Sequence, residues 1–308
     1  MGCPFRCAYC FLQIVPYFRF NKKYLMGLVY RNWDQMLAEL DEWLSATTAR
    51  MLLVGELQDG LVFDNAYKAI TGKALTHHLI PRFAAQRRHR LIFLTKSTLI
   101  KHARHLQPTP QVVFSWSVNV EYAARRWEIG PPLPSRRLRA AMEMKKRGWT
   151  VRIRLDPIIP YDENGEHWRD GYAQIIDQIN ELGPEMVTIG ALRATSTALG
   201  TVAAKNGRAA DIFRYLTAEK DPSGFKYRIP FDKQVEMYRF VVERLDRRRT
   251  VPALCKEDVS VWKAAGLRFN GCHCLLEGTQ VPRELMSAGS FKAVIEKDPR
   301  DGISSETR

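Results

Sequence analysis

Three cysteines stand within the first ten residues, in the stretch MGCPFRCAYCFLQ. Cys3, Cys7 and Cys10 have C-x3-C-x2-C spacing and make up half of the six cysteines of the chain. A disulfide framework is not expected, because such frameworks occur in short, cysteine-dense secreted chains, whereas this chain has 308 residues. Three thiols also cannot all pair with one another. The spacing therefore predicts a metal site.

The kind of metal follows from the ligands that are missing. Zinc usually takes four protein ligands, and the first histidine of the chain, His77, is far from these cysteines in the sequence. An iron–sulfur cluster held by three cysteines leaves one iron open to an external molecule. This favours a 4Fe-4S cluster, and the alternatives are a zinc site or loose surface thiols.

The cysteine motif, with Tyr9 directly before its third cysteine, resembles the signature of the radical S-adenosylmethionine enzymes. This resemblance implies that the open iron chelates S-adenosyl-L-methionine, and that an electron from the cluster cleaves it to a 5′-deoxyadenosyl radical. Tyr9 is then expected to contact the cofactor and to take part in catalysis. The resemblance also implies a glycine–glutamate element that accepts hydrogen bonds from the cofactor's amino group, here Gly55 and Glu56. Their alternative interpretation is a solvated turn.

The elements that must position these residues alternate between strands and helices. Apolar runs predict strands at 51–55, 91–95, 112–118, 150–155 and 186–190, and helical periodicity appears at 33–44, 134–147 and 167–181. Such alternation implies a parallel sheet with right-handed crossovers, buried on both faces. We therefore expect an α/β fold, a partial (β/α)6 TIM-like barrel of the radical S-adenosylmethionine type, with its chemistry at the carboxyl ends of the strands.

Polar residues follow two of these strands. Lys96 comes directly after the strand at 91–95, and Ser117 and Asn119 close the strand at 112–118. A cation could bind the cofactor's carboxylate there, and hydroxyl or amide groups could bind its ribose. Taken singly, each of them is more often a surface polar residue.

A longer run, SWSVNVEYAARRWEIGPPLPSRRLRAAMEMKKRGWTVRIRLDPIIPY, with CAYCFLQ before it and GALRAT after it, is similar to the spore photoproduct lyase group, also labelled DNA repair photolyase-like. The similarity extends from Cys3 to about Cys274. It implies a radical lyase that abstracts hydrogen from a thymine dimer lesion in DNA. The true lyase has tyrosines on both sides of the third cluster cysteine and a hydrogen-donor cysteine after the second strand. Here Phe11 replaces one tyrosine, and GELQDGLVFD contains no cysteine. We therefore expect cofactor cleavage without efficient lesion repair.

The other three cysteines are Cys255, Cys272 and Cys274. Cys255 follows the strand-like VPAL (251–254), so it is expected at a carboxyl end near the reactive centre. It is a catalytic candidate, because a thiol there could donate hydrogen to a substrate radical. It could also ligate a second metal with Cys272 and Cys274, beside His273, or it could be an idle buried thiol.

The chain is basic, with 47 Lys and Arg against 33 Asp and Glu, a net charge of +14 and a pI near 9.6. Basic clusters at 87–90, 135–139, 145–147 and 246–249 could contact phosphates, or they could be solvated helix faces. Nucleic acid is therefore one expected partner, and a reductant such as flavodoxin or ferredoxin is the other. The alternative to an enzyme is a non-enzymatic metal-cluster or zinc module that binds nucleic acid.

The chain is expected to form one core domain over residues 1–296, with a cysteine-containing C-terminal extension, followed by a flexible tail at 297–308. No apolar stretch reaches membrane-spanning length, so no membrane partner and a cytoplasmic location are expected. In the related enzymes the cysteine loop follows the first barrel strand, whereas only Met1 and Gly2 precede Cys3 here. We therefore expect the first strand to be lacking and the amino terminus to be incomplete.

Overall fold

The structure is a computed structural model that describes residues 2–13, 29, 31–195, 207–218, 220 and 226–269. Cys272, His273, Cys274 and the tail at 297–308 lie outside the described residues, so the expectations about them stay untested. Within the described part, no helix is both long enough and apolar enough to span a bilayer.

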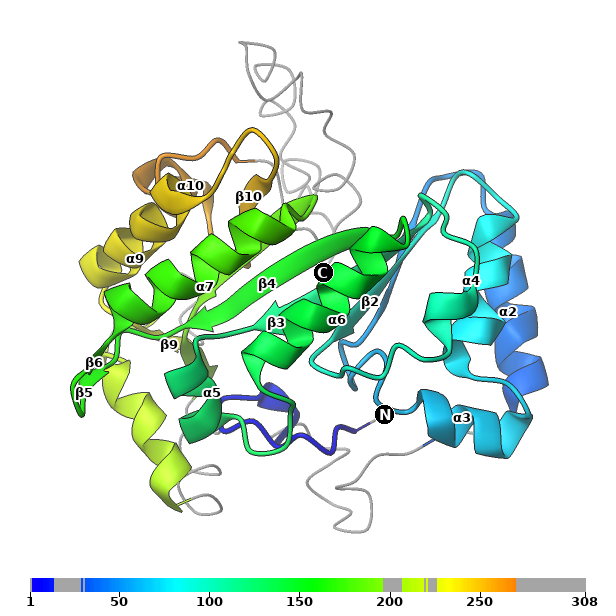
Figure 1. The fold of residues 1–308 in the computed structure, drawn as a ribbon, viewed down its shortest axis with the longest axis horizontal. Helices are drawn as coiled ribbons and strands as arrows, with labels where there is room; N and C mark the ends of the chain where they lie inside the picture. The colour runs from blue at the N-terminus through cyan, green and yellow to red at the C-terminus, as the bar shows by residue number, and fades with distance from the viewer. Residues whose placement is uncertain are drawn as a thin grey trace, which may run out of the picture.

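The centre of the fold is a parallel sheet of six strands (Figure 1). Its strands are, in order, β1 (Met51–Val54), β2 (Arg90–Thr95), β3 (Val112–Val118), β4 (Thr150–Ile158), β7 (Met186–Ala191) and β10 (Val251–Leu254). The order in the sheet is the order in the chain, so every crossover leads to the next strand, as in a partial TIM-like barrel. The predicted α/β fold and its strands are confirmed.

The strands form where the sequence has short apolar runs, and both sheet faces are covered. All seven residues of β3 are buried. Stacked rings of Phe93 and Phe114, with centroids 5.3 Å apart, link β2 to β3 within the core. Strands that are buried on both faces need apolar side chains at successive positions rather than alternation, which explains why continuous apolar runs predicted them.

Helices connect the strands. Those described are α2 (Trp33–Ser45), α3 (Asp64–Thr71), α4 (Leu75–Ala84), α5 (Glu121–Trp127), α6 (Pro134–Lys146), α7 (Trp168–Leu182), α9 (Phe231–Arg244) and α10 (Val259–Ala264). The 3-10 helices described are η1 (Phe11–Gln13), η3 (Ala103–His105) and the longer η4 (Gly207–Tyr215). Two small antiparallel ribbons pair β5 (Asp162–Glu163) with β6 (Glu166–His167), and β8 (Arg193–Thr195) with β9 (Lys226–Arg228).

The helices pack through apolar stripes. On α7, the buried residues recur at helical spacing and include Trp168, Ile175, Ile179 and Leu182. Figure 1 shows α6 and α7 lying across the sheet, while the N-terminal loop, in dark blue, lies beside α5 near the ends to which the β3 and β4 arrows point. The sheet therefore brings the cysteine loop to the edge formed by the carboxyl ends of the strands.

Candidate active site

The loop that carries the three cysteines is held by backbone hydrogen bonds to two other segments. Gly2 N donates to the carbonyl oxygen of Leu57 at 2.8 Å, and Ala8 N donates to that of Trp127 at 2.8 Å. Leu57 follows β1, and Trp127 is the last residue of α5. The loop is therefore fixed between two parts of the carboxyl edge of the sheet.

A glycine allows a third backbone contact with the loop to be close. Gly130 N donates to the carbonyl oxygen of Phe5 at 3.0 Å, and a Cβ at Gly130 would lie 2.9 Å from the Cα of Phe5. Since real Cβ atoms do not approach other atoms this closely, only glycine lets the two backbones meet here. The segment after α5 and the cysteine loop thus form one unit.

None of the three cysteines of the loop is in a disulfide; Cys7 is buried, and Cys3 and Cys10 are half-buried. Burial is the main cause that raises the pKa of the Cys3 thiol to about 12, and burial raises the pKa of Cys7 and Cys10 as well. Among the described residues, no three Cys, His, Asp or Glu side chains are gathered closely enough to hold a metal ion as they stand. Three cysteine thiols on one loop nevertheless match the donor set of an iron–sulfur cluster that is held by three cysteines.

Lys96 and Tyr9, two of the residues predicted for the cofactor site, lie in contact. Lys96 Nζ is 2.5 Å from the hydroxyl oxygen of Tyr9 and 4.9 Å from the centroid of its ring. Both side chains also donate to one carboxylate oxygen, Oε1 of Glu128, with Lys96 Nζ at 2.5 Å. The end of β2 and the cysteine loop therefore meet at Glu128.

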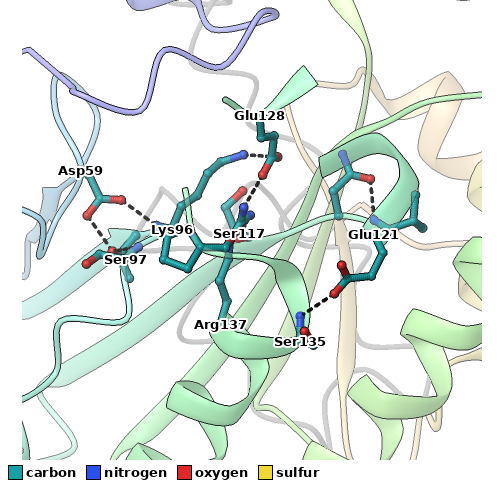
Figure 2. Close-up of polar contacts among 12 residues, drawn as sticks. Asp59, Lys96, Ser97, Ser117, Glu121, Glu128, Ser135 and Arg137 are labelled. Atoms are coloured by element: carbon teal, nitrogen blue, oxygen red, sulfur yellow. Dashed lines mark hydrogen bonds and ion pairs between the residues drawn. The ribbon is translucent and has the colours of Figure 1, made fainter. Parts of the chain in front are cut away.

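Glu128 was not predicted from the sequence. Its side chain is completely buried, and its other oxygen, Oε2, accepts from the buried guanidinium of Arg137 on α6 (Figure 2). Burial raises the pKa of Glu128, but the charges of Lys96 and Arg137 outweigh burial and bring this pKa to about 2. Glu128 is therefore an ionised carboxylate between two cations.

Arg137 belongs to the cluster at 135–139, which could have contacted phosphates or formed a solvated helix face, and for this residue both interpretations are wrong. The side chain of Arg137 is 0% exposed, and it donates to the carbonyl oxygens of Ser117 at 3.1 Å and Pro132 at 2.6 Å. A guanidinium that is buried with three partners is not available to a phosphate in solution.

Ser117 and Asn119 both lie at the carboxyl end of β3, as predicted, and both are buried. The amide of Asn119 is used within the fold. Its oxygen accepts from Val120 N and from the hydroxyl of Tyr172, each at 2.9 Å, and its nitrogen donates to the carbonyl oxygen of Pro157 at 2.9 Å. Both lone pairs of the amide oxygen are thus used, and one of the two N–H groups of the amide nitrogen is used as well. One N–H remains to bind a ligand.

Gly55 has a conformation that only glycine tolerates. Its φ is +129°, and a Cβ there would lie 2.3 Å from the carbonyl oxygen of Leu94 on β2. Glu56, the next residue, is exposed. Burial is the main cause that raises the pKa of the Cys10 thiol, and the negative charge of Glu56 raises it further. The predicted glycine–glutamate element therefore lies beside the cysteine loop.

Asp59 is a second carboxylate that the sequence did not reveal. It is buried, and it accepts from the backbone N–H of Lys96 at 2.6 Å and from the hydroxyl of Thr95 at 2.7 Å, as Figure 2 shows in part. It also accepts from the backbone N–H groups of Leu61 and Val62, each at 3.0 Å. Asp59 therefore fixes the backbone from which the Lys96 side chain extends.

Cys255 follows β10 directly, so its expected place at a carboxyl end is confirmed. It is fully buried, Arg154 Nη2 donates to its Sγ at 2.7 Å, and its thiol hydrogen-bonds the carboxylate of Asp156. Arg193 donates to its carbonyl oxygen at 3.0 Å. Burial would raise the pKa of Asp156, but the charges of Arg154 and Arg193 hold it well below its usual value.

The surroundings of Cys255 extend to α9. Glu257 accepts from the hydroxyl of Tyr238 at 2.6 Å, from Gln234 at 2.8 Å and from Arg193 at 3.3 Å. Burial raises the pKa of Glu257. Charged groups therefore surround the Cys255 thiol at the same edge of the sheet as Lys96, since Arg154 on β4 pairs in register with Ser117 on β3.

The other basic clusters lie away from this edge. The segments at 87–90, 145–147 and 246–249 lead into β2, β4 and β10, so they are at the amino ends of the strands. Lys145 Nζ, for example, lies 2.5 Å from the carbonyl oxygen of Leu182 at the end of α7. These clusters do not converge on the carboxyl edge where the thiols lie.

The family model described as spore photoproduct lyase matches residues 1–192 of the chain. The chain belongs to the spore photoproduct lyase family. The spore photoproduct lyase of Bacillus subtilis (strain 168) is 24% identical over 195 residues, which are 60% of this chain and 51% of that protein. The chain thus spans about half the length of this curated relative of the spore photoproduct lyase family.

Two solved structures of spore photoproduct lyase share the fold. A Cys-to-Ser mutant has a TM-score of 0.68 at 18% identity, covering 83% of this chain and 75% of that one. A double mutant with bound AdoMet and dinucleoside spore photoproduct has a TM-score of 0.65 at 20% identity, covering 82% and 74%. The match to the spore photoproduct lyase family model ends after β7, so Cys255 lies beyond it.

Proposed function

We propose that this protein is a radical S-adenosylmethionine enzyme in which Cys3, Cys7 and Cys10 hold a 4Fe-4S cluster. The observation that carries the proposal is the contact of Tyr9, from the cysteine loop, with Lys96, from the end of β2. Through this contact a half-buried cation lies next to the loop that carries the three cysteines, and such a cation could bind an anionic group of the cofactor. When bound, the cluster supplies an electron that cleaves S-adenosyl-L-methionine to methionine and a 5′-deoxyadenosyl radical.

In this proposal, different residues around the loop bind different groups of the cofactor. Lys96 offers its ammonium to the carboxylate, because charge-assisted hydrogen bonds to carboxylates are strong. Glu56 accepts from the amino group, with Gly55 allowing the turn, and Ser117 and Asn119 lie where the ribose would be held. Tyr9 packs its ring against Lys96 and lines the same space.

Cys255 is the residue we propose as hydrogen donor to the substrate radical. Its S–H bond breaks homolytically, and the hydrogen atom forms a C–H bond on the substrate. The thiyl radical then returns to thiol with one electron from the enzyme's one-electron reductant and one proton from solvent. The position of Cys255 at the carboxyl end of β10, with its thiol held by Arg154 and Asp156, supports this role. A flavodoxin or ferredoxin would suit as reductant, and the reduced cytoplasm would keep the thiols reduced.

The substrate we propose is a nucleic acid. A relative in the family has been solved with a dinucleoside spore photoproduct, which supports this class of substrate. Efficient repair of that lesion is not expected of this chain, because Phe11 has no phenol and residues 55–64 contain no cysteine.

Anaerobic reconstitution tests the proposal. The purified protein is loaded with iron and sulfide, reduced with dithionite and incubated with S-adenosyl-L-methionine, and 5′-deoxyadenosine is measured. Formation of 5′-deoxyadenosine, absent from a Cys7→Ala control, supports the enzyme. A protein that binds iron or zinc but forms none would instead be a metal module without catalysis.

A further inference from the structure

Glu128 joins three elements of the candidate site through one side chain. Its Oε1 accepts from Tyr9 on the cysteine loop and from Lys96 after β2, and its Oε2 accepts from Arg137 on α6. Arg137 in turn donates to the carbonyl oxygen of Ser117 at the end of β3, as Figure 2 shows. The positions of these groups therefore depend on one carboxylate.

The backbone around Glu128 reinforces this arrangement. Its N–H donates to the carbonyl oxygen of Ala124 at 3.0 Å and so completes the last turn of α5. The residues on either side hold the cysteine loop, since Trp127 O accepts from Ala8 N and Gly130 N donates to Phe5 O. One short segment thus fixes the loop by its main chain and Lys96 by its side chain.

The charges in this contact do not balance. Lys96 and Arg137 are cations, and Glu128 is the anion that both contact; the side chains of Glu128 and Arg137 are 0% exposed and that of Lys96 is 15% exposed. The carboxylate of Asp59 is used by backbone N–H groups, that of Lys96 among them at 2.6 Å, and by the hydroxyl of Thr95. A buried excess of positive charge is costly, so a second anionic group next to Lys96 would be favoured.

The hydrogen-bonding capacity of Lys96 agrees with this electrostatic argument. An ammonium has three N–H donors, and two of its directions are taken by Glu128 and Tyr9. Because two of the three N–H bonds have fixed directions, the direction of the third N–H bond is fixed as well. The ammonium is therefore aimed before any ligand arrives.

We propose that Glu128 is the positioning residue of the cofactor site, which aims Lys96 at the carboxylate of S-adenosyl-L-methionine. This inference rests on the proposed function, because it takes that cofactor as the ligand. Glu128 itself does not touch the cofactor. Its effect should therefore be specific to the carboxylate and should disappear when Lys96 is absent.

The test compares S-adenosyl-L-methionine with decarboxylated S-adenosylmethionine, which lacks the carboxylate. Equilibrium dialysis with anaerobically reconstituted protein gives both dissociation constants, and iron content is measured alongside. In Glu128→Gln, the dissociation constant for S-adenosyl-L-methionine should rise at least about tenfold and that for the decarboxylated compound less than about threefold, at unchanged iron content. Glu121→Gln on α5, whose carboxylate accepts from Ser135 N at 3.2 Å, is the matched control and should behave as wild type.

A double-mutant comparison separates positioning from a general structural effect. In a Lys96→Met background, Glu128→Gln should change neither dissociation constant further. If Glu128→Gln alone loses iron, the two dissociation constants are measured instead in the double variant Glu128→Gln with Arg137→Met. This variant removes the buried pair as a unit.

Three outcomes would overturn the inference. Glu128→Gln could bind both compounds as wild type does, it could weaken both equally, or its effect could persist without Lys96. The proposed function fails separately, if wild-type protein with a full cluster binds neither compound.

Discussion

The buried ion pair between Glu128 and Arg137 gives a prediction about stability that needs no cofactor. Arg137 donates to Glu128 and to the carbonyl oxygens of Ser117 and Pro132. Removing one partner of a buried pair costs about 3–5 kcal/mol, because the remaining charge is left without compensation. Lys96 still compensates Glu128 in part. Arg137→Met is therefore expected to lower the free energy of unfolding by about 3 kcal/mol.

Urea unfolding, followed by tryptophan fluorescence and circular dichroism, measures this loss. Arg136→Met is the matched control, because Arg136 is adjacent on α6 but exposed, and surface substitutions change the free energy of unfolding by about 0.5 kcal/mol or less. The double variant Glu128→Gln with Arg137→Met should lose less free energy of unfolding than the sum of the losses in the two single variants, since the pair is removed together. If Arg137→Met is within about 1 kcal/mol of Arg136→Met, the buried pair does not have the role described here.

Three further predictions concern the loop after β1, acid stability and the reaction. Gly55→Ala should destabilise the chain by about 2 kcal/mol or more in the same urea assay, because a Cβ would lie 2.3 Å from Leu94 O and φ is +129°; Gly72→Ala, with φ +79° but nothing within 4 Å, controls for backbone strain alone. The pKa of Glu128 is lowered from 4.5 to about 2, so its stabilising contribution is complete above pH 4.5 and is lost as the pH falls towards 2. In an acid titration, the difference in the free energy of unfolding between wild type and Glu128→Gln should shrink over this range. A difference that stays constant would contradict this prediction. The reconstituted protein should form 5′-deoxyadenosine yet fail to repair a dinucleotide spore photoproduct efficiently; catalytic repair that survives Cys255→Ala would show both that exclusion and the donor role of Cys255 to be wrong.

Much of the fold could be predicted because the information is local. Strands buried on both faces need consecutive apolar residues, so β2, β3, β4, β7 and β10 appear as short apolar runs in the sequence, as does the half-buried edge strand β1. Residues directly after such runs must lie at the carboxyl edge of a parallel sheet. This reasoning placed Lys96, Ser117 and Cys255 correctly with no knowledge of the structure.

The network that holds these residues could not be predicted in the same way. Glu128 and Tyr9 are 119 residues apart in the chain, and no periodic pattern relates them. Arg137 lies within a basic cluster, and composition alone does not distinguish its buried guanidinium from the exposed one of Arg136. Asp59 stands in a loop where a solvated carboxylate would be equally ordinary. Long-range contacts of this kind appear only when the sheet brings the strand ends together.

The same limit applies to the basic clusters. Their residues suggested a phosphate-binding surface, but their effect depends on which edge of the sheet they occupy. Since 87–90, 145–147 and 246–249 precede strands, they lie at the amino ends, opposite the thiols. Composition therefore gave the net charge of the chain and not the place where that charge acts.

The central claim is that Cys3, Cys7 and Cys10 hold a cluster that cleaves S-adenosyl-L-methionine. The most direct test measures 5′-deoxyadenosine formed by dithionite-reduced, reconstituted wild type and by the three single alanine variants at these positions, with iron content determined for each. Wild type should bind close to four irons per chain and form the product, and each variant should lose the brown chromophore or the product, because a 4Fe-4S cluster of this type needs all three thiolates. Full iron content and undiminished 5′-deoxyadenosine in all three variants would contradict the account.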